Sequence, residues 1–328
     1  MTELALALYA ALRDAHATDR ERGSSRFAAF LDAFDEGAER SRLAATGIRW
    51  LPRSDRAFPP RLASIHDPPP GLFLRGHGDP AMLAETAVAI VGARACSDYG
   101  AHVARSLARE LAATGVVVIS GLARGVDGWV HRGSLDAGGQ TVAVLGCGID
   151  RDYPRAHSSL AAEIATTGLV VSEYPPGVTP APWRFPARNR IVAGLAAATV
   201  VVEARERSGA LITADLALEE GREVLAVPGE ITSALSEGAN GLLRLGAAPA
   251  TSATDVLEAL GVDAPPPRDG GEPPGPAAAA ALAAVDRGAI TADQIARATG
   301  LEAGVVAAAL VELELGGLVE SSAGVYRR

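Results

Sequence analysis

The chain has 328 residues, a hydrophobic fraction of 48%, an aromatic fraction of 4% and a formal net charge of −9 at pH 7. These values describe a soluble globular chain that is long enough for two or three domains. The acidic balance argues against nonspecific binding of duplex nucleic acid on a broad basic surface, although it leaves room for a local basic groove. Every cation is an arginine, because the sequence contains no lysine.

No segment predicts a membrane span or a secretion signal. The longest apolar runs, such as residues 192–202, are shorter than the ~20 residues that a bilayer requires. The N-terminus begins Met-Thr-Glu without a basic region. Cys96 and Cys147 provide neither a disulfide framework nor a CxxC metal motif. We therefore expect a cytoplasmic protein that makes no membrane contact.

Residues 1–80 predict a small helical domain followed by a connector. The first part has the pattern of amphipathic helices, and the second contains the proline-rich runs 58–60 and 67–71. From residue 81 to residue 261, short apolar runs alternate with helical segments, which is typical of βαβ units. The predicted strands are 88–92, 116–120, 141–145, 169–173, 199–204 and 223–227. Their valine and isoleucine content predicts a Rossmann-like, doubly wound, mostly parallel α/β sheet covered on both faces.

Residues 262–278 predict a semi-rigid, disordered linker, because they are rich in proline and glycine and have no periodicity. Residues 279–328 contain a capping-box pattern at Thr291, a turn at Gly300 between two helical segments and a final strand pair. This order of elements predicts a winged-helix domain.

The winged helix is a candidate duplex-binding domain, but its charge argues against that role. Its expected recognition helix carries Glu302, Glu312 and Glu314, and no arginine lies between Arg297 and Arg327. Such a surface repels phosphate, so we expect a protein-contact or accessory role.

Glycine turns and arginines follow the predicted strands, at the edge where an open parallel sheet binds its ligands. The segments are Gly92-Ala93-Arg94, Ser120 to Asp127, Gly146-Cys147-Gly148, Phe185 to Arg190, Ser208 to Thr213 and Pro228-Gly229. Helix N-termini, close main-chain approach and guanidinium forks all bind phosphate. The sequence therefore predicts a ligand that carries phosphate.

These segments lack the motifs that bind nucleotide cofactors but contain one that is typical of single-stranded nucleic-acid binding. Arg94 stands where the GxGxxG fingerprint needs glycine, the second predicted strand ends in Ser120-Gly121 without an acidic residue, and no GK[ST] P-loop is present. Residues 183–190 interleave three arginines with Trp183 and Phe185, the mixture that holds single-stranded nucleic acid. The alternative is that the two aromatic side chains only anchor this segment on the sheet.

Taken together, these motifs resemble the DprA/Smf family of DNA-processing proteins over nearly all of residues 58–261. The shared segments are Phe58 to Leu62, Asp67 to Pro69, Ile90 to Arg94, Ser120 to Asp127, Tyr153-Pro154, Ser172 to Pro175, Phe185 to Arg190, Ser208 to Ala214, and Gly221 to Gly229. Ala93 departs from the serine or threonine that is frequent in the family, and the N-terminal region lacks the expected glycine-containing hairpin. That region is therefore interpreted as a degenerate SAM-like domain.

The resemblance implies an extended Rossmann fold that binds single-stranded DNA in a basic pocket, forms a homodimer and loads the RecA recombinase during natural transformation and recombination. The implied DNA-binding residues are Gly92, Arg94, Ser120, Gly121, Arg124, Phe185, Arg188, Asn189, Arg190, Ser208 and Gly209. In this interpretation the arginines grip the DNA backbone with little base selectivity. No bond is made or broken, so we expect no catalytic residue, cofactor or metal.

Other residues allow competing interpretations. Asp127 and His131 have the spacing of two metal ligands but lack a third, so Asp127 is expected to cap a helix. Cys96 and Cys147 lack a neighbouring base and are expected to be structural. Glu173 and Glu203 are expected to hold pocket arginines rather than act as acid and base.

The rival function is a nucleotide-processing enzyme or sensor of the related phosphoribohydrolase-like Rossmann group. Those enzymes carry a PGGxGTxxE signature after a late strand. In this sequence Leu216 occupies the position of the glutamate, which favours binding over hydrolysis.

Overall fold

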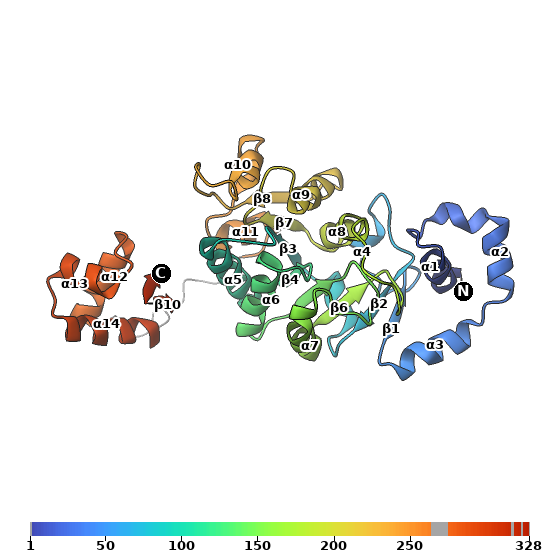
Figure 1. Ribbon diagram of the computed structural model, residues 1–328, viewed down its shortest axis with the longest axis horizontal. Coiled ribbons are helices and arrows are strands. Elements are labelled where there is room, and N and C mark those ends of the chain that lie inside the picture. The colour runs from blue at the N-terminus through green and yellow to red at the C-terminus, as the bar shows by residue number, and fades with distance from the viewer. Residues whose placement is uncertain (1, 264–274, 316–317, 323, 328) are drawn as a thin grey trace. The chain divides into compact units, whose positions relative to one another are not determined.

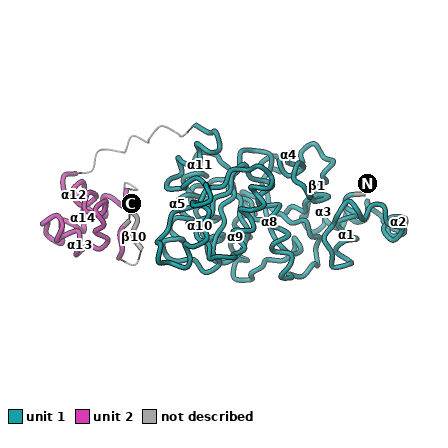
Figure 2. The backbone as a smooth tube through the Cα atoms, turned by 90° about the horizontal axis from the view of Figure 1, so that it is seen from above, with its two compact units in different colours: residues 1–264 teal, residues 265–328 magenta. Residues whose placement is uncertain are grey.

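The computed structural model describes residues 2–263, 275–315, 318–322 and 324–327. It divides into two compact units, residues 1–264 and 265–328, which are treated separately (Figure 2). Of the predicted linker 262–278, residues 264–274 lie outside the described residues, and its last residues already belong to helix α12 (Pro276–Asp286). Proline is at the first position of that helix, where its missing N–H does no harm.

Unit 1 is built on a nine-stranded sheet in the order β1-β2-β6-β5-β4-β3-β7-β8-β9 (Figure 1). The six predicted strands are confirmed as a parallel block of neighbours. They are β3 (Ala87–Val91), β4 (Val117–Ser120), β5 (Thr141–Val144), β6 (Leu169–Ser172), β7 (Ala198–Val201) and β8 (Glu223–Ala226). All residues of β3 to β7 are buried, which explains why they appear in the sequence as unbroken apolar runs.

The sheet also extends beyond the predicted strands at both edges. Strands β1 (Arg49–Pro52) and β2 (Gly71–Arg75) pair antiparallel with each other, and β2 pairs antiparallel with β6. Both lie in the segment that the sequence analysis placed in a connector, which is a correction. The proline-rich runs lie between these two strands and flank the short helix α4 (Pro60–Ala63). At the other edge, β9 (Ala248–Pro249) pairs with β8.

Helices cover both faces of the sheet, as a doubly wound fold requires (Figure 1). One face packs against α4, α8 (Arg184–Leu195), α9 (Gly209–Glu219) and α10 (Glu237–Arg244). The opposite face packs against α5 (Asp98–Ala113), α6 (Val126–Asp136), α7 (Ser158–Thr167) and α11 (Ala253–Leu260). The parallel strands therefore all deliver the loops at their carboxyl ends to one edge.

Four short helical segments precede the sheet: α1 (Thr2–Leu12), η1 (Asp19–Gly23), α2 (Ser25–Asp32) and α3 (Glu36–Ala45). An aromatic cluster around Tyr9 and Phe27 joins α1 to α2. Leu4 and Leu43 pack against apolar residues of the sheet and α7. This N-terminal helical region is thereby fixed to the β1 and β2 edge of the sheet (Figure 1).

Unit 2 contains α12, α13 (Ala292–Thr299), α14 (Ala303–Leu315) and the antiparallel pair β10 (Glu320–Ser322) and β11 (Val325–Arg327). The capping box at Thr291 is confirmed, and Gly300 ends α13 with a φ of 71°. Glu302 and Glu312 are exposed. Within the described ranges, no single helix is long and apolar enough to cross a membrane, and only the bent pair 292–299 and 303–314 passes by length and composition.

Candidate nucleic-acid interface

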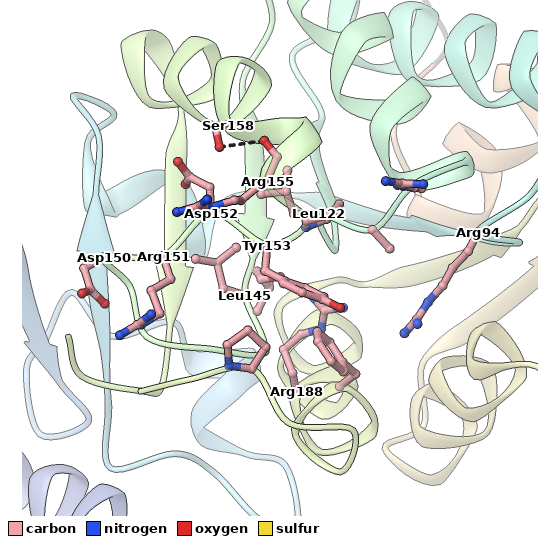
Figure 3. Close-up of a pocket in the computed structure, with 17 residues that line it drawn as sticks. Arg94, Leu122, Leu145, Asp150, Arg151, Asp152, Tyr153, Arg155, Ser158 and Arg188 are labelled. Carbon is pink, nitrogen blue, oxygen red and sulfur yellow. Dashed lines mark hydrogen bonds between the residues drawn. The ribbon is translucent and has the colours of Figure 1, made fainter. Parts of the chain in front are cut away.

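A cavity of about 900 Å³ opens among the loops that follow the carboxyl ends of β3, β4 and β5 (Figure 3). Its wall consists of Arg94, Leu122, Ala123, Arg124, Val144, Leu145, Gly146, Asp150, Arg151, Asp152, Tyr153, Pro154, Arg155, Ser158, Pro180, Phe185 and Arg188. Five of these side chains are arginines and two are aspartates. The cavity therefore combines cations from four separate segments of the chain with a partly apolar wall.

Aromatic side chains lie among these arginines. The rings of Tyr153 and Phe185 lie 5.4 Å apart with a tilt of 32°. The guanidinium of Arg94 lies 5.4 Å from the centre of the Phe185 ring. Tyr153 is 46% exposed, and Figure 3 shows it between Arg94 and Arg151. A flat ligand can thus stack beside a charge that binds phosphate.

Arg188 is the one buried arginine of the cavity wall. Its Nη1 donates to the carbonyl oxygen of Val144 at the end of β5, and its Nε donates to Asn189 Oδ1 at 3.3 Å. Burial lowers the pKa of Arg188, against the opposing effect of the nearby Asp127 carboxylate. Burial likewise raises the pKa of Asp127, against the effect of Arg188. Gly121 leaves the space for this pair, because a Cβ there would lie 2.3 Å from Asp127 Oδ2 and 2.6 Å from Arg188 Nη2.

The five cavity arginines differ from Arg75, Arg184 and Arg190 in their electrostatic partners. Among the described residues, none of the five has a carboxylate oxygen within ion-pair distance, whereas Arg75, Arg184 and Arg190 are each ion-paired. The cavity therefore presents positive charge that the protein itself leaves largely uncompensated.

Four of the predicted DNA-binding residues, Arg94, Arg124, Phe185 and Arg188, line the cavity. The other predicted residues support the surrounding segments instead: Gly92, Ser120, Gly121, Asn189, Arg190, Ser208 and Gly209. The Ser120 hydroxyl, for example, donates to the carbonyl of Ile90 at 2.7 Å. Asn189 Nδ2 donates to the carbonyl of Gly209 at 3.1 Å and so ties α8 to the start of α9. Ser208 precedes α9, and its buried hydroxyl has no hydrogen-bond partner.

Arg190 is held by carboxylates behind the cavity. Its Nη1 and Nη2 donate to the two oxygens of Glu173 at 3.0 and 2.7 Å, and its Nε donates to Asp67 at 3.3 Å. Burial alone would lower the pKa of Arg190, but Glu173 and Asp67 raise it above its ordinary value. The expectation that Glu173 holds an arginine is thus confirmed. The same expectation is wrong for Glu203, which accepts from the backbone N–H and the hydroxyl of Ser97.

Two residues considered as metal ligands have structural partners. Asp127 does not cap α6, which is a correction: the capping residue is Gly125, and the Asp127 carboxylate accepts from the N–H of Ala123 at 3.1 Å. The His131 ring lies 2.8 Å from the Thr141 hydroxyl and 2.7 Å from the Gly121 carbonyl. Burial lowers the pKa of His131 to about 4. Over the described part of the chain, no three His, Cys, Asp or Glu side chains are grouped to hold a metal ion.

Both cysteines are free thiols. Burial raises the pKa of Cys147 to about 11. Burial, followed by the Glu203 charge, also raises the pKa of Cys96. Neither environment favours the nucleophilic thiolate.

After β5, the sequence analysis named Gly146-Cys147-Gly148 as a ligand-binding segment but did not name the side chains that follow it as site residues. Arg151, Tyr153 and Arg155 all line the cavity, together with two aspartates. The sequence contained a signal for these three residues, because the segment that holds them follows the third predicted strand and so lies at the edge where ligands bind. The two aromatic residues at the start of the Trp183–Arg190 segment fit different interpretations. Phe185 lines the cavity, whereas Trp183, which precedes α8, packs edge-on against Tyr174 at 6.4 Å.

Comparison with known proteins identifies the family of this chain. The model of the family "DNA recombination-mediator protein A" matches residues 49–261, and that of the "DprA winged helix domain" matches residues 264–325. The DNA processing protein DprA of Streptococcus pneumoniae is 46% identical over 207 residues, which cover 62% of this chain and 71% of that protein. A Mycobacterium tuberculosis relative is 46% identical over 255 residues, but this chain spans only 65% of that relative's length.

Two solved structures share the fold of this chain. The X-ray structure of DNA processing protein A from Streptococcus pneumoniae has a TM-score of 0.65 at 35% identity and covers 77% of this chain and 92% of its own. The Helicobacter pylori protein, solved to explain its single-stranded DNA binding mode, has a TM-score of 0.59 at 31% identity and covers 65% of this chain and 95% of its own. The chain belongs to the DNA recombination-mediator protein A family, with a winged-helix domain at its C-terminal end.

Proposed function

We propose that this chain binds single-stranded DNA in the cavity at the carboxyl edge of its sheet and mediates loading of RecA onto that DNA. The observation that carries the proposal is that one cavity is lined both by five arginines that have no ion-pair partner within the described part of the chain and by the Tyr153–Phe185 pair. The exposed Arg94, Arg124 and Arg155 neutralise backbone phosphates, while the two rings stack on bases. Stacking needs bases that are free of a complementary strand, so the cavity favours single strands over duplex.

The second part of the proposal concerns partners. RecA and a second copy of the chain come from the family resemblance, and the recombination-mediator description of the matching family is consistent with a recombinase partner. Light scattering on the purified chain tests the homodimer. The rate of RecA filament formation on DNA coated with single-strand binding protein, with and without this chain, tests the loading activity.

The winged helix is proposed to serve as an accessory or protein-contact domain. Its helix α14 and the residue preceding it expose Glu302 and Glu312, which oppose phosphate. Tight, sequence-specific duplex binding that requires unit 2 would overturn this assignment.

No chemical step is proposed for the cavity. At the position where the phosphoribohydrolase-like signature has glutamate, Leu216 lies on α9 and packs against the apolar core. An assay for base release from nucleoside monophosphates tests this alternative, and turnover would replace the binding proposal with an enzymatic one.

The deciding experiment compares fluorescence anisotropy of labelled single-stranded and duplex oligonucleotides at several salt concentrations. We expect much tighter binding of the single strand, with an affinity that falls as salt rises. Equal affinity for the two forms would defeat the proposal.

A further inference from the structure

The loop between α1 and η1, residues 13–18, contacts Arg184, the first arginine of the Arg184–Arg190 segment, and the carboxylates that hold Arg190, the last one. Asp14 is ion-paired with Arg184, and His16 Nε2 lies 2.7 Å from Asp67 Oδ2. The other ring nitrogen of His16 lies 3.4 Å from Glu173 Oε2. Neither Asp14 nor His16 lines the cavity.

The first contact concerns a buried cation. The side chain of Arg184 is only 4% exposed, and it donates to the Asp14 carboxylate and to the carbonyl oxygen of Thr179. Its guanidinium also lies 4.9 Å from the centre of the Trp183 ring. Among the described residues, Asp14 is the one carboxylate ion-paired with Arg184. Loss of the Asp14 charge would therefore leave a buried guanidinium without a counterion, which is costly.

The second contact concerns Arg190, which follows Arg184 by six residues in α8. Glu173 and Asp67 hold Arg190, whose side chain is 10% exposed. The His16 ring is hydrogen-bonded to Asp67 through Nε2, and its Nδ1 lies 3.4 Å from Glu173 without a hydrogen bond to it. His16 thus holds one acceptor of Arg190 and lies against the other.

Phe185 and Arg188 lie between these two fixed points, and both line the cavity. The position of their side chains depends on how this part of α8 sits against the sheet, because Arg188 must reach the Val144 carbonyl at the end of β5. We propose that Asp14 and His16 are positioning residues for the cavity, so that the N-terminal helical region controls DNA affinity without touching the DNA. This inference rests on the proposed function.

Asp14 allows a discriminating test. Its side chain is 71% exposed and its φ is 51°, a left-handed conformation that asparagine adopts as readily as aspartate. Asp14→Asn therefore removes the charge with little change of shape. Charge alone predicts tighter DNA binding after loss of an acidic group, whereas the positioning role predicts weaker binding.

The experiment measures single-strand affinity of the full chain by anisotropy for wild type, Asp14→Asn, His16→Gln and the double variant. Asp32→Asn is the matched control, since Asp32 is an exposed aspartate of the same N-terminal region. We expect about fivefold weaker binding in the double variant with an unchanged dependence on salt, and no change in the control. Equal or tighter binding by the double variant would refute the positioning role, and a smaller salt dependence would indicate direct DNA contact instead.

Tryptophan fluorescence tests the positioning role of Asp14 independently of the proposed DNA binding. The sequence has three tryptophans, so Trp50→Phe with Trp129→Phe leaves Trp183 as the only tryptophan, which can be excited selectively over the tyrosines. In that background Asp14→Asn should shift the Trp183 emission to longer wavelength and increase its quenching by iodide, while Asp32→Asn should not. If wild type binds no single-stranded DNA, the proposed function fails, but this shift still decides whether Asp14 positions the start of α8.

Discussion

Arg94→Ala provides the sharpest test of how the cavity holds DNA. Arg94 is exposed, and the contact that the structure gives its guanidinium is with the Phe185 ring. Its removal should therefore leave the folded state intact. A hydrogen bond to a charged group contributes about 1.5–3 kcal/mol, which corresponds to a loss of roughly 10- to 150-fold in affinity.

The salt dependence of DNA binding gives a second quantitative prediction for Arg94→Ala. Each phosphate neutralised on a single strand contributes about 0.7 to the slope of log K against log salt. If each of the five cavity arginines neutralises one phosphate, the slope is at most about 3.5. Arg94→Ala should reduce it by about 0.7, while Arg94→Lys should retain the slope and lose only part of the affinity.

The assay is anisotropy of a labelled single-stranded oligonucleotide over a salt series, with thermal unfolding to verify that the variants are folded. Arg56→Ala is the matched control, because Arg56 is an exposed arginine that does not line the cavity. The reasoning is refuted if Arg94→Ala and Arg56→Ala change affinity and slope by equal amounts.

Three further predictions concern the framework of the site. Burial lowers the pKa of His131 from about 6.5 in the unfolded chain to about 4 in the folded chain, so the unfolded state binds more protons between these pH values. The free energy of unfolding should therefore fall by about 3 kcal/mol as the pH drops from 6.5 towards 4. Urea titrations measure this fall, which should be absent in His131→Gln. Gly125→Ala should destabilise the chain by more than about 2 kcal/mol, because Gly125 has a φ of 75° and a Cβ there would lie 2.2 Å from the Ala93 carbonyl oxygen. Gly138→Ala, with a φ of 64° and open space around it, should cost only the backbone strain, and equal losses in the two variants would contradict this account. Burial raises the pKa of Cys147 to about 11, so iodoacetamide should not alkylate this thiol at pH 8 until urea unfolds the chain. Mass spectrometry measures the labelling, and alkylation of Cys147 in the folded chain would contradict the prediction.

The central sheet could be predicted because its strands are buried on both faces. Each of β3 to β7 is an uninterrupted apolar run, so period and length alone identify it. Strands β1 and β2 could not be found in this way. Trp50 and Phe73 pair across them, but the proline-rich runs between the two strands dominate the local pattern and suggest a loop.

The site could be predicted only in part, because sequence shows which residues reach an edge but not which charges are already paired. Arg188 and Arg190 belong to one motif, yet the first lines the cavity and the second is bound by Glu173 and Asp67. Asp67 lies 123 residues before Arg190 in the chain. That pairing is a tertiary property, since it depends on the loop before β2 meeting α8.

This division among the arginines explains how a chain of net charge −9 can offer a cationic cavity. Carboxylates neutralise Arg184 and Arg190 outside the cavity wall, whereas the four exposed cavity arginines have no ion-pair partner among the described residues: Arg94, Arg124, Arg151 and Arg155. The range of electrostatic attraction in physiological salt is about 8 Å. In the proposed function, DNA in the cavity would therefore respond to these local cations rather than to acidic side chains further away. The local pairing of each arginine, and not the net charge of the chain, would then decide where DNA binds.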